Sequence, residues 1–268
     1  MKSLARVSGS IQRNGLKTTF QIGISFLRQR IRDLLIERYG NRIIDNFLAK
    51  LGDINSLDSA FDFAINWKFR GFHVIAPLQI KQEFLAFANF SLARIGKPKN
   101  IIEVGTDNGG TLFLFSQISG GNSNIISVDI NHYSKNKLDL FRSFGVTSHA
   151  RIYNICVNTK SIDEMALKEL LPTKDPVDLL FIDADHTYEA VRHDFQIFSP
   201  LVRTGGIIGF HDITPGEGNG VPKFWGELKN NYSSVEFREK DYGWGGIGVI
   251  VKDGVGSHNT TSHNSKNI

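Results

Sequence analysis

Residues 100–110 read NIIEVGTDNGG, a short apolar run followed at once by a glycine-rich loop. This pattern predicts a buried strand, a tight turn and the start of a helix. In open α/β sheets, ligands bind at the carboxyl ends of the strands. We therefore expect a ligand at this loop first, although any strand-to-helix turn can require glycine.

Four more apolar runs follow along the chain: Asn124–Ile130, Arg151–Val157, Val177–Asp183 and Gly206–Phe210. They are continuous instead of alternating, which is typical of strands covered on both faces. Helical stretches lie between them, so they predict a parallel sheet in an α/β chain. Two last runs, Val235–Arg238 and Gly246–Val251, accompany a glycine-rich turn and predict an antiparallel pair that closes the sheet.

The side chains of the loop indicate which kind of ligand it suits. A dinucleotide fingerprint that starts at Gly105 needs glycine at positions 107 and 110, but position 107 is Asp. A carboxylate there repels a pyrophosphate, and Glu103 adds a second acid just before the loop. The loop therefore favours a ligand with cationic groups, such as the sulfonium and ammonium of S-adenosylmethionine. Asp129 ends the next strand, where it can hold ribose hydroxyls or cap the following helix.

A second set of polar residues follows two later strands. Asp183, Asp185 and His186 come after one strand, and His211 and Asp212 come after the next. Because the carboxyl ends of parallel strands meet at one edge of the sheet, we expect both groups to share a crevice with the glycine loop.

The helix after the first of these groups offers a purely structural interpretation. Asp185 can cap that helix, with His193 and Asp194 on its surface. We adopt this interpretation for His193 and Asp194. For Asp183 and Asp212 we favour a functional role, because titratable groups in a cleft beside a ligand loop are typical of active sites.

Five segments together resemble the class I S-adenosylmethionine-dependent methyltransferases: EVGTDNGG, ISVDI, FIDADHTYEAVRHDF, SPLVRTGGIIGFHD and GWGGIGVIV. The closest resemblance is to the branch that includes macrolide-sugar and cephalosporin-pathway O-methyltransferases, and it covers about residues 75–252. It implies a Rossmann-like, doubly wound, mostly parallel sheet of seven strands with an antiparallel last strand. It also implies an O-methyltransferase that acts on a hydroxyl of a sugar or another small natural-product acceptor. The single thiol, Cys156, fits a reducing compartment, so we expect a cytoplasmic location.

The resemblance further implies how the cofactor is held. The methionine end would lie against Glu103, Gly105 and Gly109, and Thr106, Asp107 and Asp183 are further candidate cofactor-binding residues. Asp129 would hold the ribose, and Asn158 would face the adenine edge. Asp107 is a departure, because many relatives have glycine at that position.

Metal-dependent relatives imply a Mg²⁺ bound by Asp183 and Asp212, with oxygen ligands that suit this ion. In the sugar-modifying relatives, the histidine that matches His186 is the general base, and His211 is a second catalytic candidate here. The pair His211-Asp212 is not the intact acidic pair of those relatives, so the metal requirement stays open.

Two rival functions also stay open. One is a nicotinamide-dependent oxidoreductase on a similar sheet, against which Asp107 counts. The other is a non-catalytic scaffold that retains the cofactor fold.

Charge is concentrated at the N-terminus. The whole chain carries +4, whereas residues 1–50 hold ten basic and three acidic residues. The body is therefore slightly acidic, which does not favour a nucleic-acid partner. A single cysteine, Cys156, excludes an internal disulfide. No apolar run reaches the roughly 20 residues of a membrane span.

Residues 20–51 carry apolar residues at helical spacing, and Gly40-Asn41 predicts a break into two helices. We expect these helices to pack on the main domain or on a second subunit, with a membrane-surface helix as the alternative. The predicted division is a helical extension over 1–74, the main domain over 75–252 and a disordered tail over 253–268. The aromatic residues that can wall an acceptor pocket, or else belong to the core, are Trp67, Phe72, His73, Trp225 and Trp244.

Overall fold

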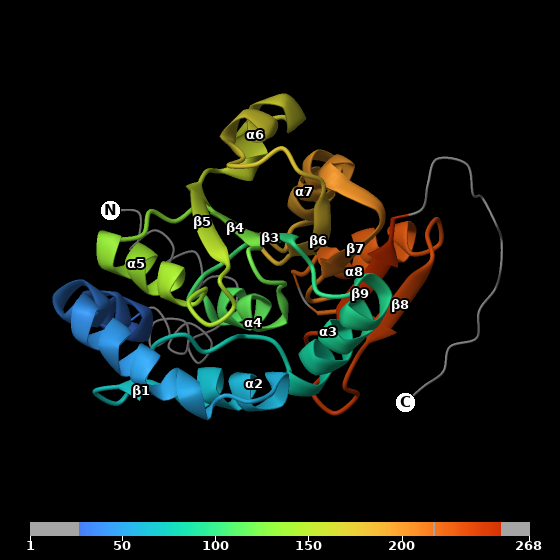
Figure 1. Ribbon diagram of the computed structural model, residues 1–268. Coiled ribbons are helices and arrows are strands. Elements are labelled where there is room, and N and C mark those ends of the chain that lie inside the picture. The colour runs from blue at the N-terminus through green and yellow to red at the C-terminus, as the bar shows by residue number, and fades with distance from the viewer. Residues whose placement is uncertain (1–26, 217, 253–268) are drawn as a thin grey trace.

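A computed structural model describes residues 27–216 and 218–252 of the chain. The predicted tail, 253–268, and the start of the predicted helical region, 20–26, lie outside these residues. The described residues form three layers, with a central sheet between two sets of helices (Figure 1).

The central sheet has seven strands in the order β5-β4-β3-β6-β7-β9-β8. Neighbouring strands from β5 to β7 pair in parallel, and β9 is antiparallel to both β7 and β8. The strands are β3 (Asn100–Val104), β4 (Asn124–Asp129), β5 (Arg151–Cys156), β6 (Val177–Ile182), β7 (Val202–Phe210), β8 (Ser234–Phe237) and β9 (Ile247–Val251). Each coincides with a predicted run to within a few residues, so the predicted fold class is confirmed.

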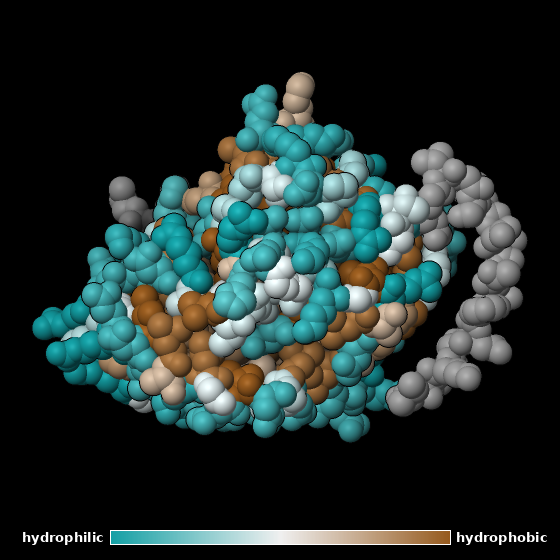
Figure 2. Space-filling view, viewed as in Figure 1, coloured by the Kyte–Doolittle hydropathy of each residue, from teal (hydrophilic) through white to brown (hydrophobic). Residues whose placement is uncertain are grey.

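Two hydrophobic cores cover the two faces of the sheet. Successive strand residues point to opposite faces, so Ile101 packs in one core and Ile102 in the other. The first core includes residues of α2 (Leu57–Asn66), α3 (Lys81–Ile95), α4 (Gly110–Ile118) and α5 (Lys135–Ser143). The second includes residues of α6 (Glu164–Leu170), α7 (Tyr188–Phe198) and α8 (Val221–Leu228). Hydrophobic residues gather in the lower part of the face shown in Figure 2, around α4 and α3.

The N-terminal helix covers residues 27–50 without a break and continues into the 3₁₀ turn η1 (Leu51–Asp53). The predicted break at Gly40-Asn41 is therefore wrong. A Cβ atom at Gly40 would lie 2.5 Å from Cγ of Asn136 in α5, so this glycine allows close helix packing instead of ending the helix. Glycine inside a helix lowers helix stability by about 1 kcal/mol relative to alanine, and burial of the apolar face of the helix offsets this loss.

The apolar face of this helix packs on the chain's own domain. Ile36, Ile43 and Phe47 are at most 1% exposed, and the Phe47 ring contacts those of Phe113 in α4 and Phe144 after α5. Packing on the main domain, one of the two predicted arrangements, is thus observed. Packing on a second subunit through this region stays a prediction. In the described part of the chain, no helix is long and apolar enough to cross a bilayer.

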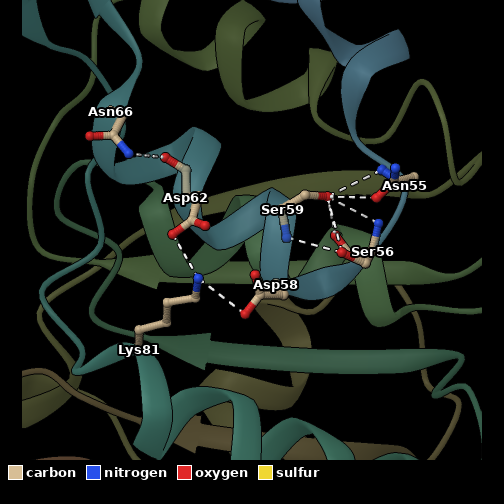
Figure 3. A network of polar contacts seen from close by, with 7 residues as sticks. All are labelled: Asn55, Ser56, Asp58, Ser59, Asp62, Asn66 and Lys81. Atoms are coloured by element: carbon tan, nitrogen blue, oxygen red, sulfur yellow. Dashed lines mark hydrogen bonds and ion pairs between the residues drawn. The ribbon is translucent and has the colours of Figure 1, made fainter.

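The segment between this helix and α3 contains α2 and a small hairpin, β1 (Lys68–Phe69) with β2 (Phe72–His73), which the sequence did not predict. Figure 3 shows how α2 is fixed. Ser56 and Ser59 form a capping box at its N-terminus. Lys81, the first residue of α3, forms ion pairs with Asp58 and Asp62 at 3.0 and 2.7 Å. These contacts join α2 to the start of α3.

Burial decides one alternative that the sequence left open and corrects one interpretation. Trp67 and Trp225 are core residues, exposed by 4% and 1%, which is the second of the two roles considered for them. Asp194 is 1% exposed and does not lie on the surface of α7. Two short 3₁₀ turns, η2 (Thr159–Ser161) and η3 (Ser199–Leu201), complete the described elements.

Candidate functional site

Sheet register brings the predicted site residues together at one edge. Val104 of β3 pairs with Ile182 of β6, and Ile182 pairs with Phe210 of β7. The ladder continues one residue further, because the Asp183 N–H donates to the Val104 carbonyl at 2.8 Å and the His211 N–H donates to the Ile182 carbonyl at 3.1 Å. The order of the strands reverses between β3 and β6, because β4 and β5 lie on one side of β3 and β6 and β7 lie on the other. Such a switch point is where α/β sheets bind ligands.

The glycines of the loop after β3 are required by the chain itself. Gly105 has φ +93°, and a Cβ there would lie 2.0 Å from the Asp183 carbonyl oxygen. A Cβ at Gly110 would lie 2.3 Å from the Ile75 carbonyl oxygen. The glycines therefore let the loop pack against β6 and the segment before α3, a role that the sequence did not distinguish from close approach to a ligand.

Asp129, at the end of β4, binds the backbone of this loop. Its Oδ2 accepts hydrogen bonds from the N–H groups of Thr106 at 2.8 Å and Asp107 at 3.1 Å. Its Oδ1 accepts one from the Asn131 N–H at 2.8 Å. The helix-cap alternative is wrong, because Ser134 caps α5. A carboxylate offers about four acceptor positions, so Asp129 retains about one for a ligand.

Two other acids of the loop are buried. Glu103 is 0% exposed, neither of its carboxylate oxygens has a hydrogen-bond partner, and burial raises its pKa well above the ordinary value. Asp107 has φ +43° and accepts a hydrogen bond from the Gln29 amide at 3.2 Å. Burial raises the pKa of Asp107, against the positive charges of Arg32 and Lys137.

The histidines and aspartates after β6 and β7 form a compact cluster. The His211 Nδ1 lies 3.3 Å from Asp183 Oδ1 and 3.5 Å from Asp212 Oδ1. The His186 Nε2 lies 3.1 Å from Asp212 Oδ2 and 3.9 Å from Asp183 Oδ1. The His211 side chain is only 3% exposed, whereas that of His186 is 49% exposed. His186 thus lies at the solvent side of the cluster.

The charges in this cluster stabilise one another. Burial alone would raise the pKa of Asp183, but His211 and His186 outweigh it and hold that pKa well below its usual range. Burial alone would lower the pKa of His211, but Asp183 and Asp212 raise it to about 10. Asp183 and Asp212 also raise the pKa of His186. The two carboxylates thus favour the protonated form of His211, whose charge compensates one of them.

The cluster also contains a donor set for a divalent cation. One ligand atom each from Asp183, His186 and Asp212 lie within 4.8 Å of one another. Two carboxylates fit Mg²⁺, whereas an imidazole suits transition metals better. Asp212 has φ +59°, an uncommon conformation for a residue other than glycine, and its carbonyl accepts a hydrogen bond from the Asn219 amide at 2.8 Å.

These side chains surround a cavity of about 410 Å³, which we call the transfer cavity. Predicted site residues on its wall are Gly105, Thr106, Asp107, Asp183, His186, His211 and Asp212. Trp244, predicted for an acceptor pocket, lines it as well. Glu103, Gly109, Asp129 and Asn158 are not among its lining residues. Asn158 is exposed and its side chain caps η2.

The sequence analysis missed Gln79, which orients Asp183. Its amide donates to Asp183 Oδ2 at 2.6 Å, and its carbonyl accepts a hydrogen bond from the Thr111 hydroxyl. Gln79 and Asp183 are 104 residues apart in the chain. A lone glutamine before a helix carries no signal of this contact, although the nearby Pro77 indicates an extended segment.

Glu83 of α3 holds the loop that carries Trp244. It is 2% exposed and accepts hydrogen bonds from the N–H groups of Glu239 at 2.7 Å and Gly246 at 2.8 Å. Burial raises the pKa of Glu83, while these two bonds act to lower it. The loop in turn accepts a hydrogen bond at the Gly245 carbonyl from the Thr214 N–H at 2.9 Å, so it is tied to the segment that follows Asp212.

Comparison with known proteins gives a family match over the site. Residues 102–213 match the family model of a methyltransferase domain. The uncharacterized protein R132 of Acanthamoeba polyphaga mimivirus is 30% identical over 118 residues, 41% of this chain and 50% of that protein. The uncharacterized protein y4gI of Sinorhizobium fredii is 28% identical over 148 residues, 53% of this chain and 16% of that protein. The chain thus spans half the length of the first relative and less of the second.

A solved structure confirms the architecture. The O-methyltransferase TomG of Streptomyces achromogenes, involved in tomaymycin synthesis and crystallised with S-adenosylmethionine, has a TM-score of 0.51 at 14% identity. The match covers 75% of this chain and 91% of that one. At this identity the likeness shows the fold. Residues 102–213 thus match the model of a methyltransferase domain, and the chain shares the Rossmann-like fold of that O-methyltransferase.

Proposed function

We propose that this chain transfers a methyl group from S-adenosylmethionine to a hydroxyl of a small-molecule acceptor, such as a sugar or another natural product. The observation that carries the proposal is the transfer cavity. One space of about 410 Å³ joins the glycine loop of a methyltransferase domain to two carboxylates and two histidines.

The acids of the transfer cavity support a cationic cofactor. Asp107 and Asp183 line this cavity, and carboxylates attract a ligand with positive charge. The ammonium of S-adenosylmethionine would lie near them, and the sulfonium supplies the methyl group. Asp107 at the cavity wall disfavours a pyrophosphate, which counts against the nicotinamide alternative.

The chain's own residues would then activate the acceptor. His186 is the more exposed histidine and lines the transfer cavity, so its neutral imidazole can take the acceptor's proton at Nε2 as a general base. Asp183 and Asp212 raise the pKa of His186, which stabilises the imidazolium that this transfer forms. His211 would remain protonated and balance the charge of the carboxylates. The cavity walls would align the acceptor oxygen with the methyl–sulfur bond, and such positioning can lower the activation free energy by about 7–11 kcal/mol.

Mg²⁺ belongs to the same proposal. Asp183 and Asp212 would hold it, and when bound it supplies positive charge that acidifies the acceptor hydroxyl. Asp183 is already fixed by Gln79, which keeps one of its oxygens in place for this role.

Calorimetry and turnover test the function. We expect S-adenosylmethionine and S-adenosylhomocysteine to bind the purified chain, and NAD not to bind. Release of S-adenosylhomocysteine in a screen of sugar, polyketide and phenolic alcohols should identify the acceptor. Binding of NAD alone would overturn the proposal, and cofactor binding without turnover on any hydroxyl acceptor would favour the scaffold alternative.

Metal removal tests the Mg²⁺ assignment separately. Treatment with EDTA should abolish turnover, and Mg²⁺ should restore it. Full activity in EDTA would refute the metal while leaving His186 as an unaided base.

A further inference from the structure

A second, larger cavity of about 570 Å³ adjoins the transfer cavity. We call it the arginine cavity. The two cavities share Ala76, Leu78, Asp107 and Asn108 as wall residues. Its volume lies within the range of small-molecule sites, roughly 300–1,000 Å³. A ligand that fills it therefore lies directly beside the reacting groups.

The arginine cavity has a basic wall and an apolar wall. Arg28, Gln29 and Arg32 of the N-terminal helix form the basic wall, where positions 28 and 32 share one helical face. Ile65 and Phe72 contribute to the apolar wall. A ligand that suits both walls has a polar, anionic end and an apolar body.

Neither arginine of this wall is neutralised by the ion pairs found among residues 27–216 and 218–252. The Nε of Arg32 is buried without a hydrogen-bond partner. Its neighbour Asp33 forms an ion pair with Lys137 at 3.3 Å, and Asp107 accepts its hydrogen bond from Gln29. Burial lowers the pKa of Arg32, although Asp107 and Asp33 act to raise it.

The charges that face the cavity leave a positive balance. Arg28 and Arg32 outnumber the single carboxylate, Asp107. A buried guanidinium is stabilised by an anion that accepts two parallel hydrogen bonds, a geometry that carboxylates and phosphates provide.

We propose that the arginine cavity binds the carboxylate or phosphate group of the methyl acceptor. Arg28 and Arg32 hold the anion, the apolar body lies against Phe72 and Ile65, and the hydroxyl to be methylated extends into the transfer cavity. This inference rests on the proposed function and adds the substrate class to it: hydroxylated acceptors with an anionic group.

Benzoate, its neutral isostere benzamide and inorganic phosphate are suitable probes, measured by ligand-observed NMR and calorimetry on the full chain. We expect benzoate and phosphate to bind and benzamide to bind at least about tenfold more weakly. The double variant R28Q/R32Q should lose about tenfold or more in affinity for both anions. The double variant R30Q/R42Q removes two exposed arginines of the same helix that do not line the cavity, and it should bind like the parent.

Titration with S-adenosylhomocysteine distinguishes the acceptor from the cofactor as the source of the anion. We expect its affinity to be the same in the parent and in R28Q/R32Q, with no competition from benzoate. If R28Q/R32Q weakens S-adenosylhomocysteine, the arginines bind the cofactor carboxylate and the proposal is wrong. If both anions fail to bind, or if R30Q/R42Q loses them equally, the proposal is also wrong. If S-adenosylhomocysteine itself does not bind the parent, the proposed function fails instead.

Discussion

The transfer cavity and the arginine cavity are neighbours built in different ways. The walls of the first come mainly from residues that directly follow β3, β6 and β7, so the register of the sheet sets their positions. The basic wall of the second comes from a helix that is held by packing against α4 and α5. The transfer cavity therefore suits chemistry that needs fixed geometry. The arginine cavity suits recognition of an acceptor, because its basic wall depends on how one helix packs.

The largest expected effect tests the chemistry of the transfer cavity. His186→Gln should lower kcat by about 10²–10⁴-fold, as is typical when a general base is removed. Affinity for S-adenosylhomocysteine, measured by calorimetry, should stay the same. His149→Asn is the matched control, because His149 is exposed with φ +55° and asparagine tolerates that conformation. If the His186→Gln enzyme retains the parental kcat, His186 is not the general base.

The next effect tests whether the loop after β3 depends on contact with β6. Gly105→Ala should destabilise the fold by about 2–4 kcal/mol, because it combines a positive φ with a clash against the Asp183 carbonyl. Urea denaturation measures the change. Gly226→Ala in α8 meets no atom within 4 Å and should stabilise the fold by about 0.5–1 kcal/mol. Equal effects of the two variants would contradict the assigned role of Gly105.

A smaller effect separates two roles of Asp129. Asp129→Ala should weaken S-adenosylhomocysteine binding by about 1.5–3 kcal/mol if the carboxylate holds the ribose. It should also destabilise the fold, since three backbone N–H groups lose their acceptor. Calorimetry and urea denaturation report the two roles independently. If the variant is destabilised but retains full affinity for S-adenosylhomocysteine, Asp129 stabilises the loop and does not hold the ribose.

The smallest effect concerns the loop that carries Trp244. Glu83→Gln should lower the free energy of unfolding by about 1 kcal/mol, because one of two charge-assisted hydrogen bonds to the loop backbone weakens. Amide exchange over residues 238–246 should become faster. Glu169→Gln, at an exposed position of α6, is the control and should leave exchange there as it was. Unchanged exchange in Glu83→Gln would show that the loop is held by its other contacts.

The predictions from sequence succeeded where chemistry follows a strand. Asp183 and His211 were expected at one edge of the sheet, and the parallel register places them there. The predictions from sequence failed where the role of a residue depends on packing against distant parts of the chain. Gly40 was expected to break a helix but accommodates Asn136, and Asp194 was expected on a helix surface but is buried.

The sequence by itself determined the strands, the glycine loop and the acidic and histidine clusters, because hydrophobic periodicity and strand-end positions are local properties. Only the tertiary structure decided that Gln79 orients Asp183, that Asp129 binds the loop backbone and that Arg28 and Arg32 face a cavity. Several of these contacts join residues far apart in the chain, as with the 104 residues between Gln79 and Asp183. Long-range packing sets such contacts, and no local pattern of residues encodes it.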